Sequence, residues 1–98
     1  RKLTLLIGML EDKDIDSVLE ILLPHFNKVI TTTPNNPRAI NSDILREKVL
    51  KYVDDVTSKH EIEDAVNYTL ETSSEDDIII SAGSLYMIGT VRTLVKKL

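Results

Sequence analysis

Short apolar runs alternate with amphipathic segments along the chain, and this alternation limits the possible folds more than any other feature. Residues 2–8 ("KLTLLIG"), 28–33 ("KVITTT") and 77–82 ("DIIISA") have the length and composition of buried strands. Between them, apolar residues recur at spacings of three and four, which predicts helices. Strands that alternate with helices are typical of βαβ units, so we expect an α/β fold with a mostly parallel sheet.

Four helices and one further strand are expected. One helix follows Asp14, a second has Ser42 as its N-cap, a third spans 61–72 and the last begins at Leu85. A very short strand is expected around Val56. We expect the first helix to bury Ile15, Val18, Leu19 and Leu22. The second is expected to carry Ile44, Leu45, Val49, Tyr52 and Val53 on its apolar side, and the third Ile62, Ala65, Val66 and Leu70.

Composition narrows the classes of partner. The 98 residues are enough for one domain, the formal net charge is −4 and aromatic residues make up 4%, which argues against nucleic acid. No apolar run approaches the length that crosses a bilayer, so no membrane partner is expected. The absence of cysteine excludes thiolate metal sites and fits a cytoplasmic location. His25 and His60 stand in no metal-ligand spacing, so a structural or solvent-facing role is expected for both.

The least generic stretches of the sequence follow the expected strands. They are residues 8–14 ("GMLEDKD"), 31–39 ("TTTPNNPRA") and 81–86 ("SAGSLY"). In open parallel sheets, ligands bind beyond the carboxyl ends of the strands, which all lie on one edge. A binding site is therefore expected where these three segments meet.

Arg38 is the first candidate residue of this site. Pro34 and Pro37 restrict its loop, which lowers the entropy lost when the loop holds a ligand. A guanidinium offers two parallel N–H donors that match a carboxylate or a phosphate. A solvated arginine on a stiff connector is the other interpretation, and the residues alone leave both open.

The other two segments also allow two interpretations. Gly83 and Ser84 stand at a strand-to-helix junction, which either binds an anion at the helix N-terminus or serves only as a cap. The hydroxyl of Tyr86 lies either at the rim or in the core. Asp12 and Asp14 offer carboxylates to a magnesium ion, but stabilisation of a helix N-terminus is the favoured role.

Three ordered motifs, "GMLEDKD", "TTPNNPRA" and "GSLYMIGTVR", make the chain resemble the C-terminal domain of bacterial folylpolyglutamate synthase, often bifunctional with dihydrofolate synthase. That family belongs to the Mur-type ligases. The likeness covers residues 1–98, a minor part of a full-length enzyme, and it implies a Rossmann-like three-layer domain. The family's first strand and helix, with an Asp-Gly-Ala-His-Asn segment that contacts ATP, are missing here. We therefore expect the chain to be a fragment of a longer protein.

The resemblance implies an ATP-dependent amide ligation, in which a folate carboxylate is phosphorylated and the amino group of glutamate attacks it. ATP and Mg2+ would be bound mainly by an N-terminal domain outside this chain, which by itself would be inactive. In related Mur ligases, the arginine of an Asn-Pro-Arg motif binds the carboxylate of the added amino acid. By this match, Asn36, Arg38, Ser84 and Tyr86 are expected to bind glutamate, with no catalytic or metal-ligating residue in the chain.

Two alternatives remain: another Mur-type amino-acid ligase, or a non-catalytic α/β module that binds a small ligand or a protein. The Gly-Ser-Leu-Tyr stretch favours the folate enzymes, because the resemblance implies a different motif in the Mur enzymes. In Rossmann-like sheets the first strand lies centrally, so its loss would expose strand edges. We therefore expect the isolated chain to be oligomeric or strand-exchanged.

Overall fold

The computed structural model describes residues 3–11, 14–73 and 77–82. The elements are β1 (Leu3–Ile7), α1 (Ile15–Leu22), the 3-10 turn η1 (Leu23–His25), β2 (Lys28–Thr31), α2 (Ser42–Val49), β3 (Val56–Ser58), α3 (Ile62–Thr72) and β4 (Ile78–Ala82). The expected strands and the first three expected helices are confirmed, including the short strand around Val56. The helix expected from Leu85 lies outside the described residues. Among these elements, no helix combines the length and the apolar character needed to cross a membrane.

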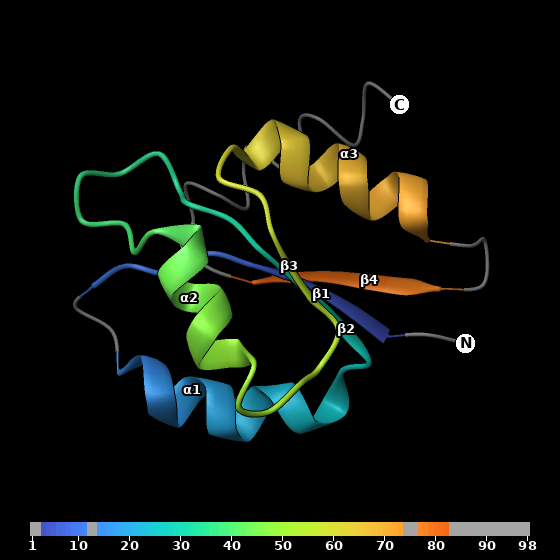
Figure 1. The fold of residues 1–98 in the computed structure, drawn as a ribbon, viewed down its shortest axis with the longest axis horizontal. Coiled ribbons are helices and arrows are strands. Elements are labelled where there is room, and N and C mark those ends of the chain that lie inside the picture. The colour runs from blue at the N-terminus through green and yellow to red at the C-terminus, as the bar shows by residue number, and fades with distance from the viewer. Residues whose placement is uncertain (1–2, 12–13, 74–76, 83–98) are drawn as a thin grey trace.

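The four strands form one sheet in the order β3-β2-β1-β4, and every neighbouring pair is parallel. Helices α1 and α2 lie on one face of this sheet and α3 lies on the other (Figure 1). The three layers confirm the expected α/β, Rossmann-like class. Strand β1 has a neighbour on each side, and its residues from Thr4 to Ile7 are buried on both faces.

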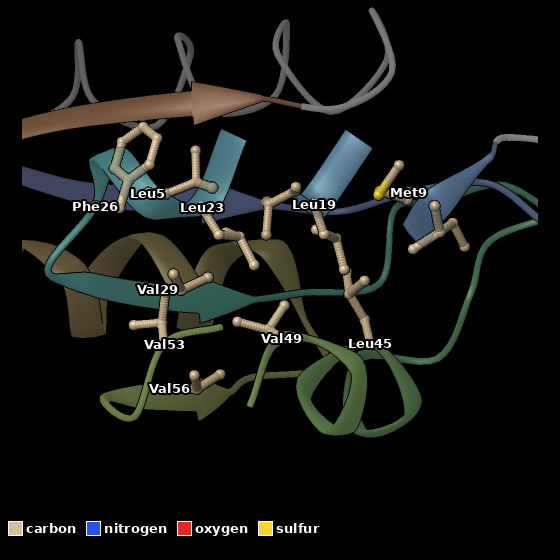
Figure 2. Packing of buried hydrophobic residues seen from close by; sticks show 12 residues of the cluster. Leu5, Met9, Leu19, Leu23, Phe26, Val29, Leu45, Val49, Val53 and Val56 are labelled. Atoms are coloured by element: carbon tan, nitrogen blue, oxygen red, sulfur yellow. The ribbon is translucent and has the colours of Figure 1, made fainter. Parts of the chain in front are cut away.

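The larger core cluster fills the space between the sheet and the helices α1 and α2. Leu19 and Leu23 from the first helical segment and Leu45 from α2 gather around Leu5 and Val29 of the sheet (Figure 2). The face under α3 has a smaller cluster, whose buried members are Leu6, Ile30, Ile62, Ala65 and Val66. These clusters hold the crossover helices against the two faces of the sheet.

Two details of the helices differ from the sequence-based expectation. The N-cap of α2 is Asn41, whose side-chain oxygen accepts a hydrogen bond from the N–H of Asp43 at 2.8 Å, and Ser42 is the first helical residue. Ile44 is exposed because the buried side of α2 carries Leu45 and Val49, and Tyr52, also exposed, lies beyond the end of α2. Val18 and Leu70 also lie at the solvent-facing margins of their helices.

Strand β4 is exposed although it contains three consecutive isoleucines. Ile78, Ile79 and Ile80 are 40%, 37% and 42% exposed. Consecutive side chains of a strand point to opposite faces, so both faces of β4 reach solvent. Within the described residues, β4 pairs only with β1 and stands at the outer edge of the sheet.

We expect Leu19→Ala to lower the free energy of unfolding by about 2–5 kcal/mol, since it removes a fully buried side chain and leaves a cavity. Ile21→Ala on the same helix is the matched control, because Ile21 is 76% exposed whereas Leu19 is 0% exposed. Urea unfolding followed by circular dichroism measures both changes. Equal losses for the two variants would contradict the placement of α1.

Candidate functional site

The direction in which strands are added to the sheet reverses between β1 and β4, although all the strands are parallel. From β1 the chain moves to β2 and then to β3 on one side, whereas β4 is added on the other side of β1. In open α/β sheets, ligands bind at the carboxyl ends of the strands next to such a reversal. Ile7 and Ala82 are paired, so β1 and β4 end at the same level. The site expected from topology is therefore beyond these two strand ends.

The loop that carries Arg38 is a folded turn held by its own hydrogen bonds. The side-chain oxygen of Asn36 accepts a hydrogen bond from the N–H of Arg38 at 2.8 Å. The carbonyl oxygen of Asn36 accepts one from the N–H of Ala39 at 3.0 Å, and its own N–H donates to Pro34. Asn36 thus closes the turn on both sides of Pro37, which has no N–H to offer.

This turn contacts the segment that follows β1 along the edge of the sheet where the carboxyl ends of the strands lie, which is called the rim below. Ala39 and Leu10 form an antiparallel bridge, and the N–H of Glu11 donates to the carbonyl oxygen of Arg38 at 2.8 Å. The N–H of Ile40 donates to Met9 at 2.9 Å. The connections after β1 and after β2 accordingly run side by side, on the left of Figure 1. The backbone of Arg38 is therefore held near the end of β1, and the Arg38 side chain is exposed there.

Three threonine hydroxyls at the end of β2 hold the base of the loop. Thr31 donates to the carbonyl oxygen of Ser42 at 2.8 Å, and Thr32 donates to the carbonyl oxygen of His60 at 3.1 Å. The hydroxyl oxygen of Thr33 accepts the N–H of Ser42 at 2.9 Å and lies 3.0 Å from Nδ1 of His60. The end of β2 is thus connected to the start of α2 and to the segment between β3 and α3.

A second group of polar side chains extends this base. The hydroxyl of Ser58 lies 2.6 Å from Oδ1 of Asp43 and 2.9 Å from the hydroxyl of Ser42. An ionised carboxylate can only accept hydrogen bonds, so the single hydroxyl proton of Ser58 is donated to Asp43. The Ser58 oxygen then accepts a hydrogen bond from the hydroxyl of Ser42. The start of α2 is therefore fixed to the end of β3 by side chains alone.

A cleft of about 400 Å3 lies beside the loop, toward α3. It is lined by Thr33, Pro34, Asn35, His60, Glu61, Ile62 and Glu63. Two of these residues are glutamates and none is an arginine or a lysine, so the lining does not suit a carboxylate ligand. The backbone of Arg38 is hydrogen-bonded to the segment after β1, whereas this cleft adjoins α3 and the segment before it. The cleft is therefore distinct from the expected carboxylate site.

Asn36 and Arg38 lie together as expected, but the contact between them involves the backbone of Arg38 and not its guanidinium. The side-chain oxygen of Asn36 accepts the backbone N–H of Arg38, and this hydrogen bond forms the turn. Ser84 and Tyr86 lie outside the described residues, as does Asp12. Asp14 caps α1 as expected, with its carboxylate 2.8 Å from the hydroxyl of Ser17. Among the described residues, no group of three or more acidic, histidine or cysteine side chains could hold a metal ion.

Sequence reasoning missed the structural part played by the threonine run, and it did not identify Thr33 as the partner of His60. The available signal was the run of three hydroxyl residues where a buried strand ends, since buried hydroxyls require partners. Their partners, however, lie 9 to 28 residues away along the chain. Only the pairing of β2 with β3 brings His60 to Thr33.

These features define an α/β domain whose sheet edge presents an arginine-bearing turn at the reversal of strand order. Residues 1–85 match the family model described as Mur ligase, glutamate ligase domain, and the chain belongs to this family. No curated protein sequence matches the chain significantly.

Solved structures of folylpolyglutamate synthases have the same fold. The Mycobacterium tuberculosis enzyme complexed with ADP is 26% identical, with a TM-score of 0.78 over 95% of this chain and 23% of that protein. Escherichia coli FolC in complex with ADP is 21% identical, with a TM-score of 0.87 over 99% of this chain and 23% of that protein. The bifunctional folylpolyglutamate synthase/dihydrofolate synthase of Yersinia pestis, complexed with AMPPNP and a Mn ion, is 20% identical, with a TM-score of 0.80 over 97% and 22%. The chain thus spans less than a quarter of the length of these proteins.

We expect Asn36→Ala to speed amide hydrogen exchange at Arg38 by roughly fivefold, since one hydrogen bond contributes about 1 kcal/mol. Asn36→Asp keeps an oxygen acceptor at the same place, and exchange should stay within twofold of the parent protein. Exchange at Leu45, whose N–H donates to Asn41 in α2, serves as an internal control. Unchanged exchange at Arg38 in Asn36→Ala would exclude the turn-forming role.

Proposed function

We propose that the chain is the C-terminal domain of an ATP-dependent folate–glutamate ligase, a folylpolyglutamate synthase. Its membership of the Mur ligase family and its likeness to folylpolyglutamate synthases support this proposal. The observation that carries it is the Arg38 turn, which is held against the end of β1 at the reversal of strand order. Whether dihydropteroate is a second substrate is a separate property of the full enzyme.

In the proposed reaction, ATP transfers its γ-phosphoryl group to a folate carboxylate and forms an acyl phosphate. The amino nitrogen of glutamate attacks the carbonyl carbon, phosphate leaves with the electrons of the C–O bond, and the nitrogen loses a proton. The part assigned to this domain is to hold the incoming glutamate. Its Arg38 guanidinium binds a glutamate carboxylate, with Ser84 and Tyr86 proposed to complete the pocket.

We assign ATP and Mg2+ mainly to an N-terminal domain outside this chain. The Yersinia pestis relative binds AMPPNP and a Mn ion, and the Mycobacterium tuberculosis relative binds ADP. The described residues here offer no cluster of metal-ligating side chains. The two domains would close over the nucleotide, and this chain alone would show no turnover. A cytoplasmic location is proposed with this function, and the absence of cysteine fits it.

Another Mur-type amino-acid ligase is the second candidate, because the family model covers such enzymes as well. An Arg38 turn that binds a carboxylate would serve either ligase equally. The similarity to folylpolyglutamate synthases favours folate as the acceptor. Assay of the full-length enzyme with a reduced folate, rather than a cell-wall precursor, distinguishes the two.

We expect Arg38→Ala in the full-length enzyme to raise the KM for glutamate far more than the KM for ATP. Loss of a charged partner from a closed site costs about 2–4 kcal/mol of binding free energy. Arg46→Ala is the matched control, since Arg46 lies on the exposed side of α2 and contacts Glu47. Steady-state kinetics with each substrate varied measures both constants. An unchanged glutamate KM in Arg38→Ala would refute the carboxylate role.

We further propose that the isolated 98-residue chain self-associates through the outer edge of β4. The three half-exposed isoleucines support this, because long apolar edge strands favour pairing with another chain. The proposal concerns the chain by itself. In a longer protein, a segment from outside residues 3–82 would pair with this edge of β4 instead.

Sedimentation velocity should show the isolated chain gaining mass with concentration, and Ile80→Lys should keep it monomeric, since charge at an edge opposes strand pairing. Ile44→Lys on α2 introduces the same charge at an exposed isoleucine away from β4, and it should associate like the parent chain. A stable monomer at high concentration would contradict the proposal.

A further inference from the structure

One hydrogen bond joins the two residues that flank the loop from Pro34 to Asn41. Thr33 lies two residues after Thr31, where β2 ends, and Ser42 is the first residue of α2. The hydroxyl oxygen of Thr33 accepts the N–H of Ser42 at 2.9 Å, so the two ends of the loop are tied at its base. Ser42 is buried, and its N–H is one of the first-turn groups that have no partner within the helix.

The same hydroxyl also contacts His60. A threonine hydroxyl has one proton and two acceptor lone pairs, and Ser42 uses one lone pair. Nδ1 of His60, at 3.0 Å, either accepts the hydroxyl proton or donates to the second lone pair. The backbone N–H of Thr33 also donates to the carbonyl oxygen of His60 at 3.0 Å. Thr33 is therefore held by His60 through both its backbone and its side chain.

At the other end of the loop, Asn41 caps α2 with its side chain, and backbone contacts join the loop to the segment after β1. Ala39 bridges to Leu10, and Ile40 donates to Met9. These contacts join the Arg38 turn to the segment after β1, but they do not connect it to β2, α2 or β3. The Thr33 hydroxyl is the side-chain contact that connects the loop base to both α2 and the β3–α3 segment. The placement of Arg38 relative to the sheet thus depends on both ends of the loop.

We propose that Thr33 is a positioning residue of the amino-acid site: its hydroxyl, fixed by Ser42 and His60, holds the 34–41 loop so that Arg38 meets the carboxylate of the incoming amino acid. This inference rests on the proposed role of Arg38. Thr33 itself touches no substrate in this arrangement and acts only through the loop. A threonine there supplies both an acceptor for Ser42 and a contact for His60, which neither valine nor alanine offers.

Steady-state kinetics of full-length Thr33→Val and Thr33→Ser enzymes test the proposal. Thr33→Val keeps the shape but leaves the N–H of Ser42 without its acceptor, and it should raise the glutamate KM about tenfold. The ATP KM, and kcat at saturating glutamate, should stay within twofold. Thr33→Ser retains the hydroxyl and should restore the parent glutamate KM. Thr57→Val removes a threonine hydroxyl that contacts Tyr68 at 3.2 Å, and as the control it should leave all constants within twofold.

A double variant separates positioning from general damage. If Thr33 acts through Arg38, Arg38→Ala/Thr33→Val should have the same glutamate KM as Arg38→Ala alone, because residues that act as one unit are not additive. Additive effects would overturn the proposal. An equal rise of the glutamate and ATP KM values in Thr33→Val would overturn it as well.

The outcomes also distinguish this inference from the proposed function. A normal glutamate KM in Arg38→Ala refutes the carboxylate role, whereas a raised KM there together with a normal KM in folded Thr33→Val refutes only the role of Thr33. If Thr33→Val does not fold, His60→Ala decides, since the His60 side chain is 61% exposed and its loss threatens the fold little. His60→Ala should raise the glutamate KM selectively, by about threefold, and an unchanged value would overturn the proposal.

Discussion

The end of β2 is the point on which the geometry of the rim depends. Thr31 and Thr32 are fully buried, and a buried hydroxyl without a partner would be destabilising, so their bonds to Ser42 and His60 are structural necessities. The same bonds hold the start of α2 and the segment between β3 and α3 against β2. The shape of the loop that carries Arg38 is consequently set inside the folded chain, before any ligand is present.

The strand order explains why the arginine turn, rather than the cleft beside it, is the better candidate site. Both lie at the carboxyl ends of strands, but only the turn reaches β1, next to the reversal of strand order. The cleft is lined by Glu61 and Glu63, which would repel a carboxylate. The amino acid of the proposed function carries a carboxylate, which suits the side of the rim where Arg38 lies. The charge of the lining and the topology therefore select the same place.

Much of the fold was predictable because its signals are local. Strands β1, β2 and β4 follow from continuous apolar runs, and Asp14 caps α1 within its own turn. The N-cap of α2 was not predictable, since Asn41 and Ser42 are both good caps. Ser42 instead lies in the buried first turn, with its hydroxyl against Ser58 of β3. The exposure of Ile44 likewise depends on how little of α2 the sheet covers.

The expected meeting of the segments after β1 and β2 is confirmed, whereas most of the third segment, 81–86, lies outside the described residues. Prolines on both sides of two asparagines indicated a stiff loop, and in the structure Asn36 adds to this by closing the turn with its own hydrogen bonds. The pairing of Arg38 with the segment after β1, and of Thr33 with His60, joins residues 27 positions apart or farther. No short-range pattern encodes such contacts, and they appear only once the parallel register of the sheet is fixed.

Arg38 combines an exposed side chain with a firmly held backbone, and this combination has a thermodynamic consequence. A loop that is already ordered loses little conformational entropy when it binds, so more of the guanidinium–carboxylate interaction is retained as affinity. An exposed ion pair in water nevertheless contributes little by itself. The full value of the interaction is reached only when a second wall excludes water from it, because the effective dielectric then falls. If Arg38 binds a carboxylate as proposed, this arginine on an open rim would form half of the binding site, and the closing of another domain over it would couple amino-acid recognition to the assembly of the reacting groups.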